Sequence, residues 1–247
     1  MPLLSAADAA RRIYCAIDTP DLARAETLAR ALAGAGCGIK LGLEFFSAQG
    51  PAGVARVRKA AGGDLFLDLK FHDIPNTVAA AVRAAAPLAP TIVNVHAAGG
   101  RAMMSAAAEA AREAAAKAGT PAPLVIAVTV LTSLETVDIE RMGVIGGVEE
   151  QVVRLAALAH EAGLDGVVCS AREITPIRRA LGPDFTLVTP GIRPAGADVG
   201  DQKRVMTPGE AITAGADYLV IGRPITGAED PAAAACAIAA EISATGN

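Results

Sequence analysis

The stretch "LFLDLKFHDIPNT" (residues 65–77) shows how this chain folds, because an apolar strand pattern runs directly into a helix start. Leucine occupies every second position from 65 to 69, which is the two-residue period of a β-strand. Pro75 comes just after a turn and is typical of the first residue of an α-helix, where its missing N–H is not needed. The stretch therefore predicts one strand followed by one helix.

The same strand-then-helix unit recurs along the chain. Eight short apolar runs are expected to be strands, at residues 13–18, 38–43, 65–70, 91–96, 124–131, 166–170, 186–190 and 218–222. Their near-continuous hydrophobicity suits parallel strands covered on both faces. Alanine-rich helical stretches fill the gaps, and several end at Gly, a usual helix C-cap. Eight strands alternating with eight helices predict an α/β fold, a single (β/α)8 TIM barrel over residues 1–247.

An open, doubly wound sheet is the alternative arrangement of parallel strands. It is disfavoured because the first strand is not followed by the GxGxxG turn of dinucleotide-binding folds. Two connections of the predicted barrel are long, residues 132–147 and 191–206. Long loops in compact domains are usually functional.

Composition excludes several classes of function. The chain is 52% hydrophobic but only 3% aromatic, it has no Trp, and its net charge is −4, which argues against a nucleic-acid partner. No apolar run approaches the roughly 20 residues of a membrane span, and the N-terminal pattern is not that of a signal peptide. The four cysteines form no CxxC pair, which favours buried thiols over zinc ligands or disulfides: Cys15, Cys37, Cys169 and Cys236. We therefore expect a cytoplasmic protein.

Charged residues gather where the predicted strands end, which is where (β/α)8 barrels carry their active sites. Asp18 ends the first strand, Lys40 lies within the second, and Asp68 and Lys70 end the third. Asp68 and Lys70 are two residues apart, so their side chains leave the same face of the strand. One such pair would be interpreted as a buried ion pair filling the barrel. Four charges from three adjacent strands favour a functional site, because burying them is costly unless they pair with one another or with a ligand.

The segment "YLVIGRPI" (218–225) indicates a phosphate site. Loops after the seventh and eighth strands recurrently bind phosphate in these barrels. Gly222 lets the backbone approach an anion closely, and Arg223 offers a bidentate fork of N–H donors. A phosphorylated substrate is therefore expected.

Other polar residues have two interpretations from the local sequence. Asp73 suits a helix-capping acid as well as a site residue, and Thr77 suits an ordinary first-turn residue. Among the histidines, His160 is expected on a helix surface. His72 and His96 are expected to pack or to form hydrogen bonds near the site, and not to bind a metal.

Taken together, the motifs "DLKFHDIPNT", "PGIRP…DQKRV" and "YLVIGRPI" closely resemble the orotidine 5′-phosphate decarboxylase family in its bacterial form. Further matches are "AIDTPD", "IKLGLEFF" and "VTVLTS", so the resemblance runs from about residue 11 to residue 240. It implies a carboxy-lyase of pyrimidine biosynthesis that converts orotidine 5′-phosphate to UMP and CO2, the last step of de novo UMP synthesis. It also implies that no metal or other cofactor takes part.

The resemblance also implies a role for each matching residue. Lys70 would be the proton donor, Asp68 would lie beside the substrate carboxylate, and Lys40 would join the charged network. Asp73 and Thr77 would reach into the neighbouring subunit's site, making a homodimer with shared active sites. The catalytic set would be Lys40, Asp68, Lys70 and Asp73. The further substrate contacts would be Asp18 and Lys40 to the ribose, Thr132 to the pyrimidine amide, Gln202 between base and phosphate in a closed lid, Arg193 at a ligand-contacting lid position, and Gly222 with Arg223 at the phosphate.

Two rival functions remain open at this point. A metal-dependent keto-gulonate-phosphate decarboxylase shares the fold and the bare DxKxxD pattern, and Glu44 and Asp68 could hold its Mg²⁺. The DIPNT and DQKR segments disfavour it. A catalytically inactive sensor of phosphorylated metabolites would have lost some of the charged residues, yet the full set is present.

Overall fold

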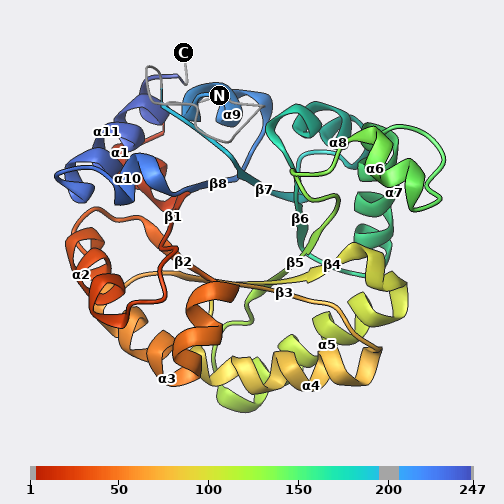
Figure 1. The fold of residues 1–247 in the computed structure, drawn as a ribbon, viewed down its shortest axis with the longest axis horizontal. Helices are drawn as coiled ribbons and strands as arrows, with labels where there is room; N and C mark the ends of the chain where they lie inside the picture. Colours follow the sequence, from red (N-terminus) through yellow and green to blue (C-terminus); the bar gives the residue numbers. More distant parts are fainter. Residues whose placement is uncertain (1–3, 195–205, 246–247) are drawn as a thin grey trace.

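The computed structural model describes residues 4–194 and 206–245. Within these ranges, parallel strands close into a barrel in chain order, and the last strand pairs with the first (Figure 1). The strands are β1 (Ile13–Ala16), β2 (Gly38–Gly42), β3 (Leu65–Phe71), β4 (Ile92–His96), β5 (Leu124–Val128), β6 (Gly166–Val168), β7 (Thr186–Pro190) and β8 (Tyr218–Ile221). The predicted (β/α)8 barrel is confirmed.

Helices surround the barrel on its outside (Figure 1). They are α1 (Ala6–Arg11), α2 (Leu22–Leu32), α3 (Leu43–Ala61), α4 (Pro75–Ala85), α5 (Gly100–Ala118), α6 (Thr136–Arg141), α7 (Val148–Glu161), α8 (Ile174–Leu181), α9 (Pro208–Ala214), α10 (Arg223–Thr226) and α11 (Pro231–Ala244), with short 3-10 turns η1 (Ala86–Leu88), η2 (Ala97–Gly99) and η3 (Ala171–Glu173). None of the helices in the described ranges is long and apolar enough to cross a membrane.

The expectation of eight helices is wrong. An additional helix, α1, precedes the first strand, and the chain after β8 forms both α10 and α11. The segment 132–147, expected to be a loop, contains α6, where the Glu135 and Asp138 side chains form a capping box that stabilises the first turn. Most of the other long connection, residues 191–206, lies outside the described residues.

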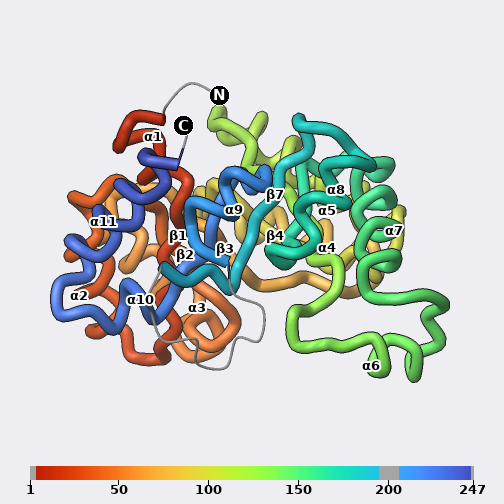
Figure 2. Tube along the Cα trace, turned by 90° about the horizontal axis from the view of Figure 1, so that it is seen from above, coloured from red at the N-terminus to blue at the C-terminus, as the bar shows by residue number. Residues whose placement is uncertain are grey.

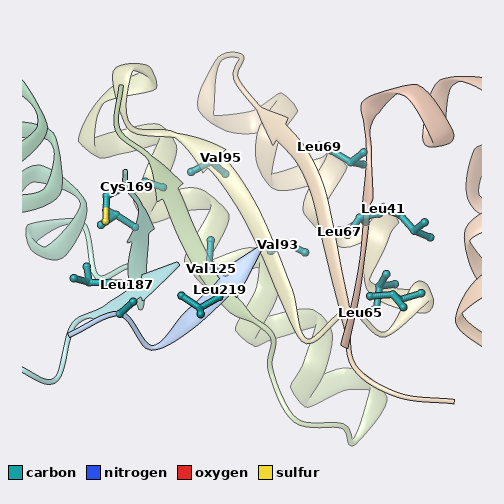
Figure 3. Close-up of a cluster of buried hydrophobic side chains, with 14 of the residues drawn as sticks. Leu41, Leu65, Leu67, Leu69, Val93, Val95, Val125, Cys169, Leu187 and Leu219 are labelled. Carbon is teal, nitrogen blue, oxygen red and sulfur yellow. The ribbon is translucent and has the colours of Figure 1, made fainter. Parts of the chain in front are cut away.

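Strand residues alternate between two apolar cores because successive side chains point to opposite faces. The barrel interior holds a small cluster contributed by strands, made of Tyr14, Ala16, Phe66, Ile92, Ile126, Val188 and Val220. The larger core lies between the strands and the surrounding helices, and Leu65, Leu67 and Leu69 of β3 belong to it (Figure 3). Phe66 points inward and its leucine neighbours point outward, so Asp68 is expected to point inward as well.

Several predicted strands are shorter than expected, and in β1 and β5 the difference positions site residues. β1 ends at Ala16 instead of residue 18, and β5 ends at Val128 instead of residue 131. Asp18 and Thr132 therefore lie on the connections that leave the C-terminal ends of these strands. This end of the barrel also carries α6, which lies opposite α1 in the side view (Figure 2).

Candidate active site

A cavity of about 560 Å³ opens at the C-terminal ends of the strands. Its wall comes from the ends of β1, β2, β3, β5, β6, β7 and β8 and from the residues that follow them. The volume is in the range of ordinary small-ligand sites. Among its lining residues are eight that the sequence singled out, namely Asp18, Lys40, Asp68, Lys70, Thr132, Arg193, Gly222 and Arg223.

Four of these residues, from β2, β3 and the connection after β1, form a chain of alternating charges. The Lys40 ammonium lies 3.3 Å from Asp18 Oδ1 and 3.2 Å from Asp68 Oδ2. Asp68 Oδ1 in turn accepts a hydrogen bond of 2.6 Å from Lys70 Nζ. We call Asp18, Lys40, Asp68 and Lys70 the charge chain. The predicted convergence of these side chains is present in the structure.

The charge chain is most buried at its middle, and at its end the side chain of Lys70 is 28% exposed. The side chain of Asp18 is 63% exposed, whereas those of Lys40 and Asp68 are 10% and 12% exposed. Burial raises the pKa of Asp68, but the charges of Lys40 and Lys70 and two hydrogen bonds to its carboxylate outweigh burial. The pKa of Asp68 is therefore lowered, and the group is ionised at neutral pH.

Asn94 is a residue of this site that the sequence reasoning missed. It lies in β4, is 1% exposed, and its Nδ2 donates to Asp68 Oδ1 at 2.7 Å. Its Oδ1 accepts from the backbone N–H of Lys70 at 2.8 Å. The sequence feature that could have indicated it is a single amide within the apolar run "TIVNVH" (91–96). A polar side chain buried in a strand needs a hydrogen-bond partner, so this amide predicts a polar neighbour.

The cavity wall near β7 and β8 carries two arginines. Arg193 is buried, and its Nη1 donates to the carbonyl of Ile192 at 2.9 Å. Arg223 is exposed and is the first residue of α10, directly after Gly222. This side of the cavity is therefore suited to an anionic group.

Two predicted site residues within the described ranges do not line this cavity. Asp73 and Thr77 are exposed, and Asp73 accepts a hydrogen bond from the N–H of Ile74 at 2.7 Å. The N-cap of α4 is Ile74, so the interpretation of Asp73 as the capping residue is wrong, while Pro75 does open the helix as predicted. Gln202 lies outside the described residues.

The histidines lie as the sequence suggested. The rings of His72 and His96 pack against each other with centroids 5.4 Å apart. Burial, the neighbouring His72 and the charge of Lys70 lower the pKa of His96. His160 is exposed. Over residues 4–194 and 206–245, no group of three or more His, Cys, Asp or Glu side chains is arranged to hold a metal ion.

Comparisons with known proteins agree on one family. The family model that matches is described as the orotidine 5′-phosphate decarboxylase / HUMPS family and covers residues 11–238. Orotidine 5′-phosphate decarboxylase of Moorella thermoacetica is 61% identical over 232 residues, which are 94% of this chain and 92% of the relative. The protein of the same name in Rhodospirillum rubrum is 61% identical over 230 residues, 93% of each chain.

A solved structure is similar in fold as well. Orotidine 5′-phosphate decarboxylase from Lactobacillus acidophilus matches with a TM-score of 0.81 and 36% sequence identity, over 94% of this chain and 99% of that one. The resemblance read from the sequence motifs is thereby confirmed.

The two acids of the charge chain should differ in their effect on stability. Asp68→Asn leaves two largely buried ammonium groups without their shared partner, so we expect it to lower the free energy of unfolding by about 3 kcal/mol. Asp18→Asn removes an exposed partner of Lys40 and should cost less than about 1 kcal/mol. Urea unfolding of both variants at pH 7 measures the difference, and equal losses would contradict the central position of Asp68.

The loss in free energy of unfolding caused by Asp68→Asn should depend on pH in a definite direction. Because folding lowers the pKa of Asp68, its ionised form stabilises the fold above the ordinary carboxyl pKa of about 3.9. This contribution disappears as the pH falls through the lowered pKa of the folded state. The stability gap between wild type and Asp68→Asn should be full at neutral pH and close below about pH 4.

Proposed function

We propose that this chain, which belongs to the orotidine 5′-phosphate decarboxylase / HUMPS family, removes CO2 from orotidine 5′-phosphate to give UMP, without a metal or another cofactor. The observation that carries the proposal is the charge chain, which presents the Lys70 ammonium, paired with Asp68, at the wall of a nucleotide-sized cavity. The names of the relatives support the same substrate.

The substrate is proposed to lie across the cavity with its phosphate toward β7 and β8. Arg223 and the backbone at Gly222 would bind the phosphate, with Arg193 close by, because guanidinium groups bind phosphate oxygens with paired hydrogen bonds. Next to this wall, at the ends of β1 and β2, Asp18 and Lys40 would bind the ribose hydroxyls. Thr132 would contact the amide of the pyrimidine, and Gln202 would bridge base and phosphate.

Lys70 is proposed to do the chemistry at C6 of the pyrimidine ring. When the bond between C6 and the carboxylate breaks, the electron pair stays on C6 in an orbital in the ring plane, where the ring π system cannot delocalise it. A fixed ammonium next to C6 stabilises this charge and then gives it a proton. In a cavity shielded from water, this interaction is much stronger than in bulk solvent.

Asp68 has two effects in this proposal. Its carboxylate holds the Lys70 ammonium at the cavity wall through the 2.6 Å hydrogen bond to Nζ. It would also lie beside the carboxylate of the substrate, whose negative charge is lost as neutral CO2 departs. The repulsion between the two carboxylates is therefore present in the bound substrate and relieved in the transition state.

Asp73 and Thr77 are proposed to act in the site of a second subunit. Both are exposed and outside the lining of their own chain's cavity, and Ile74 between them is 67% exposed. An apolar side chain that is this exposed beside two polar site residues suits a contact between subunits. Asp73 from one subunit would then complete the charge chain of the other.

The direct test is the ultraviolet absorbance change of orotidine 5′-phosphate with purified protein, with and without excess chelator. Conversion to UMP at the same rate in both conditions is the expected result. Folded protein that leaves this substrate unchanged, but acts on a keto-sugar phosphate once Mg²⁺ is added, would replace the proposal by the metal-dependent function. Loss of turnover with chelator alone would contradict the metal-free reaction.

Removing the Lys70 amine tests its role as proton donor. We expect Lys70→Ala to lower kcat by about 10⁴-fold or more, because it removes both the charge and the proton that C6 needs. UMP carries no carboxylate at C6, so its dissociation constant should change little. Lys59→Ala, which removes an exposed lysine of α3, is the matched control and should retain full activity. Decarboxylation by Lys70→Ala at the normal rate would rule out the role.

Mixing two inactive variants tests the shared site. In a heterodimer of Lys70→Ala and Asp73→Asn subunits, one site lacks both groups and the other has both. With random exchange, half of the dimers are mixed and one of their two sites is intact, so about a quarter of the wild-type activity should return. If mixed dimers form, as shown by mass spectrometry, and no activity returns, Asp73 does not act across the interface.

A further inference from the structure

Asn94 connects the last two residues of the charge chain, Asp68 and Lys70, through both of its amide atoms. The NH2 group donates to the Asp68 carboxylate at 2.7 Å, and the carbonyl oxygen accepts from the backbone N–H of Lys70 at 2.8 Å. The side chain belongs to β4, and its two partners belong to β3. One buried neutral group thus ties an acid and the lysine that follows it to the neighbouring strand.

The backbone that Asn94 holds is irregular. Leu67 pairs with Val93 and Phe71 pairs with Val95, so β3 uses four residues where β4 uses two. Lys70 lies in this bulge with φ +51°, a left-handed conformation that costs a residue other than glycine about 1 kcal/mol or more. Asn94 lies between the two paired valines, opposite the bulge. Its amide oxygen gives the N–H of Lys70 the acceptor that regular strand pairing would otherwise supply.

Lys70 is consequently fixed both at its backbone and at its ammonium group. Its backbone N–H is held by Asn94, and its ammonium is held by Asp68 Oδ1, the same oxygen that receives the Asn94 amide. The other carboxylate oxygen of Asp68 faces Lys40. Because the amide is neutral, it orients Asp68 without changing the charge of the cluster. An additional acid at this place would repel Asp68, and an additional base would compete with Lys70.

We propose that Asn94 is a positioning residue for the decarboxylation: by fixing the Asp68 carboxylate and the strained backbone of Lys70 together, it holds the ammonium at the reacting carbon. This inference rests on the proposed function, which supplies the reacting carbon. Asn94 itself does not touch the substrate in this proposal. Its effect passes through Asp68 and Lys70.

Two variants and a matched control test the proposal. Asn94→Leu is close in size and removes both hydrogen bonds. Asn94→Asp keeps the acceptor for the Lys70 N–H and replaces the donor to Asp68 by a second carboxylate, so it provides the test if the leucine variant does not fold. The control is Thr129→Val, because Thr129 is also buried and its hydroxyl donates across strands, to the carbonyl of Val168 at 3.1 Å.

Three measurements on each folded protein test whether Asn94 is a positioning residue. They are kcat, the dissociation constant of UMP, and the pKa of Asp68 from ¹³C NMR titration of its carboxyl carbon. For Asn94→Leu we expect kcat to fall on the order of 10- to 100-fold, with UMP binding almost unchanged. The pKa of Asp68 should rise, because the ionised carboxylate loses a hydrogen bond while Lys40, Lys70 and Asp18 are still present. Asn94→Asp should lose activity to a similar degree at neutral pH.

A purely structural role for Asn94 predicts a different result. Asn94→Leu would then resemble Thr129→Val, with a melting temperature lower by about 2–4 °C and with kcat and the pKa of Asp68 unchanged, and this outcome would overturn the proposal. If the wild-type protein does not decarboxylate orotidine 5′-phosphate, the proposed function fails separately. The NMR titration still decides the role of Asn94, since an unchanged pKa of Asp68 rejects its control over the charge chain and a raised pKa supports it.

Discussion

The carboxylate of Asp68 is the interaction on which the rest of the site depends. Two ammonium groups, from Lys40 and Lys70, approach its two oxygens, and an amide donates to one of them. Each of these groups would be costly to bury alone, and together with Asp18 they form a hydrogen-bonded cluster in which two acids balance two ammonium groups. Asp68 therefore allows two positive charges to lie where water is scarce, and this is the condition under which a positive charge can act strongly on a bound substrate.

The two apolar cores of the barrel provide the water-poor surroundings of these charges. The leucines of β3 point outward against the helices, while Phe66 points inward and fills the barrel below the charges. The same two-residue period then places Asp68 on the inner face, two residues after Phe66 and nearer the C-terminal end of β3. The barrel interior below the charge chain is filled with packed side chains, so the charged groups cannot lie deeper in the barrel. Their hydrogen bonds therefore hold them at the cavity wall.

The sequence predicted those features that follow from simple periodicity. Eight apolar runs predicted the eight strands, and the two-residue spacing of Asp68 and Lys70 predicted a shared site. It did not predict the bulge that places Lys70 at positive φ, because a bulge arises from the register between two strands and not from the pattern of one. Asn94 was missed for the same reason. The importance of its amide comes from the displaced backbone opposite it, and the strand pattern alone shows only an interrupted apolar run.

The charge count of the site also constrains the proposed reaction. Within one subunit, Asp18 and Asp68 balance Lys40 and Lys70, so these four groups are neutral before the substrate binds and before Asp73 of a second subunit adds its charge. In the proposed reaction, the substrate carboxylate would add one negative charge beside Asp68, and this charge would pass to C6 as CO2 leaves. Transfer of a proton from Lys70 would then make the product carbon neutral and leave the charge chain with one net negative charge. The Lys70 side chain is itself 28% exposed, so water in the open cavity can reach the amine and return the proton. The opening that admits the substrate would therefore also admit the water that restores the ammonium once the product has formed.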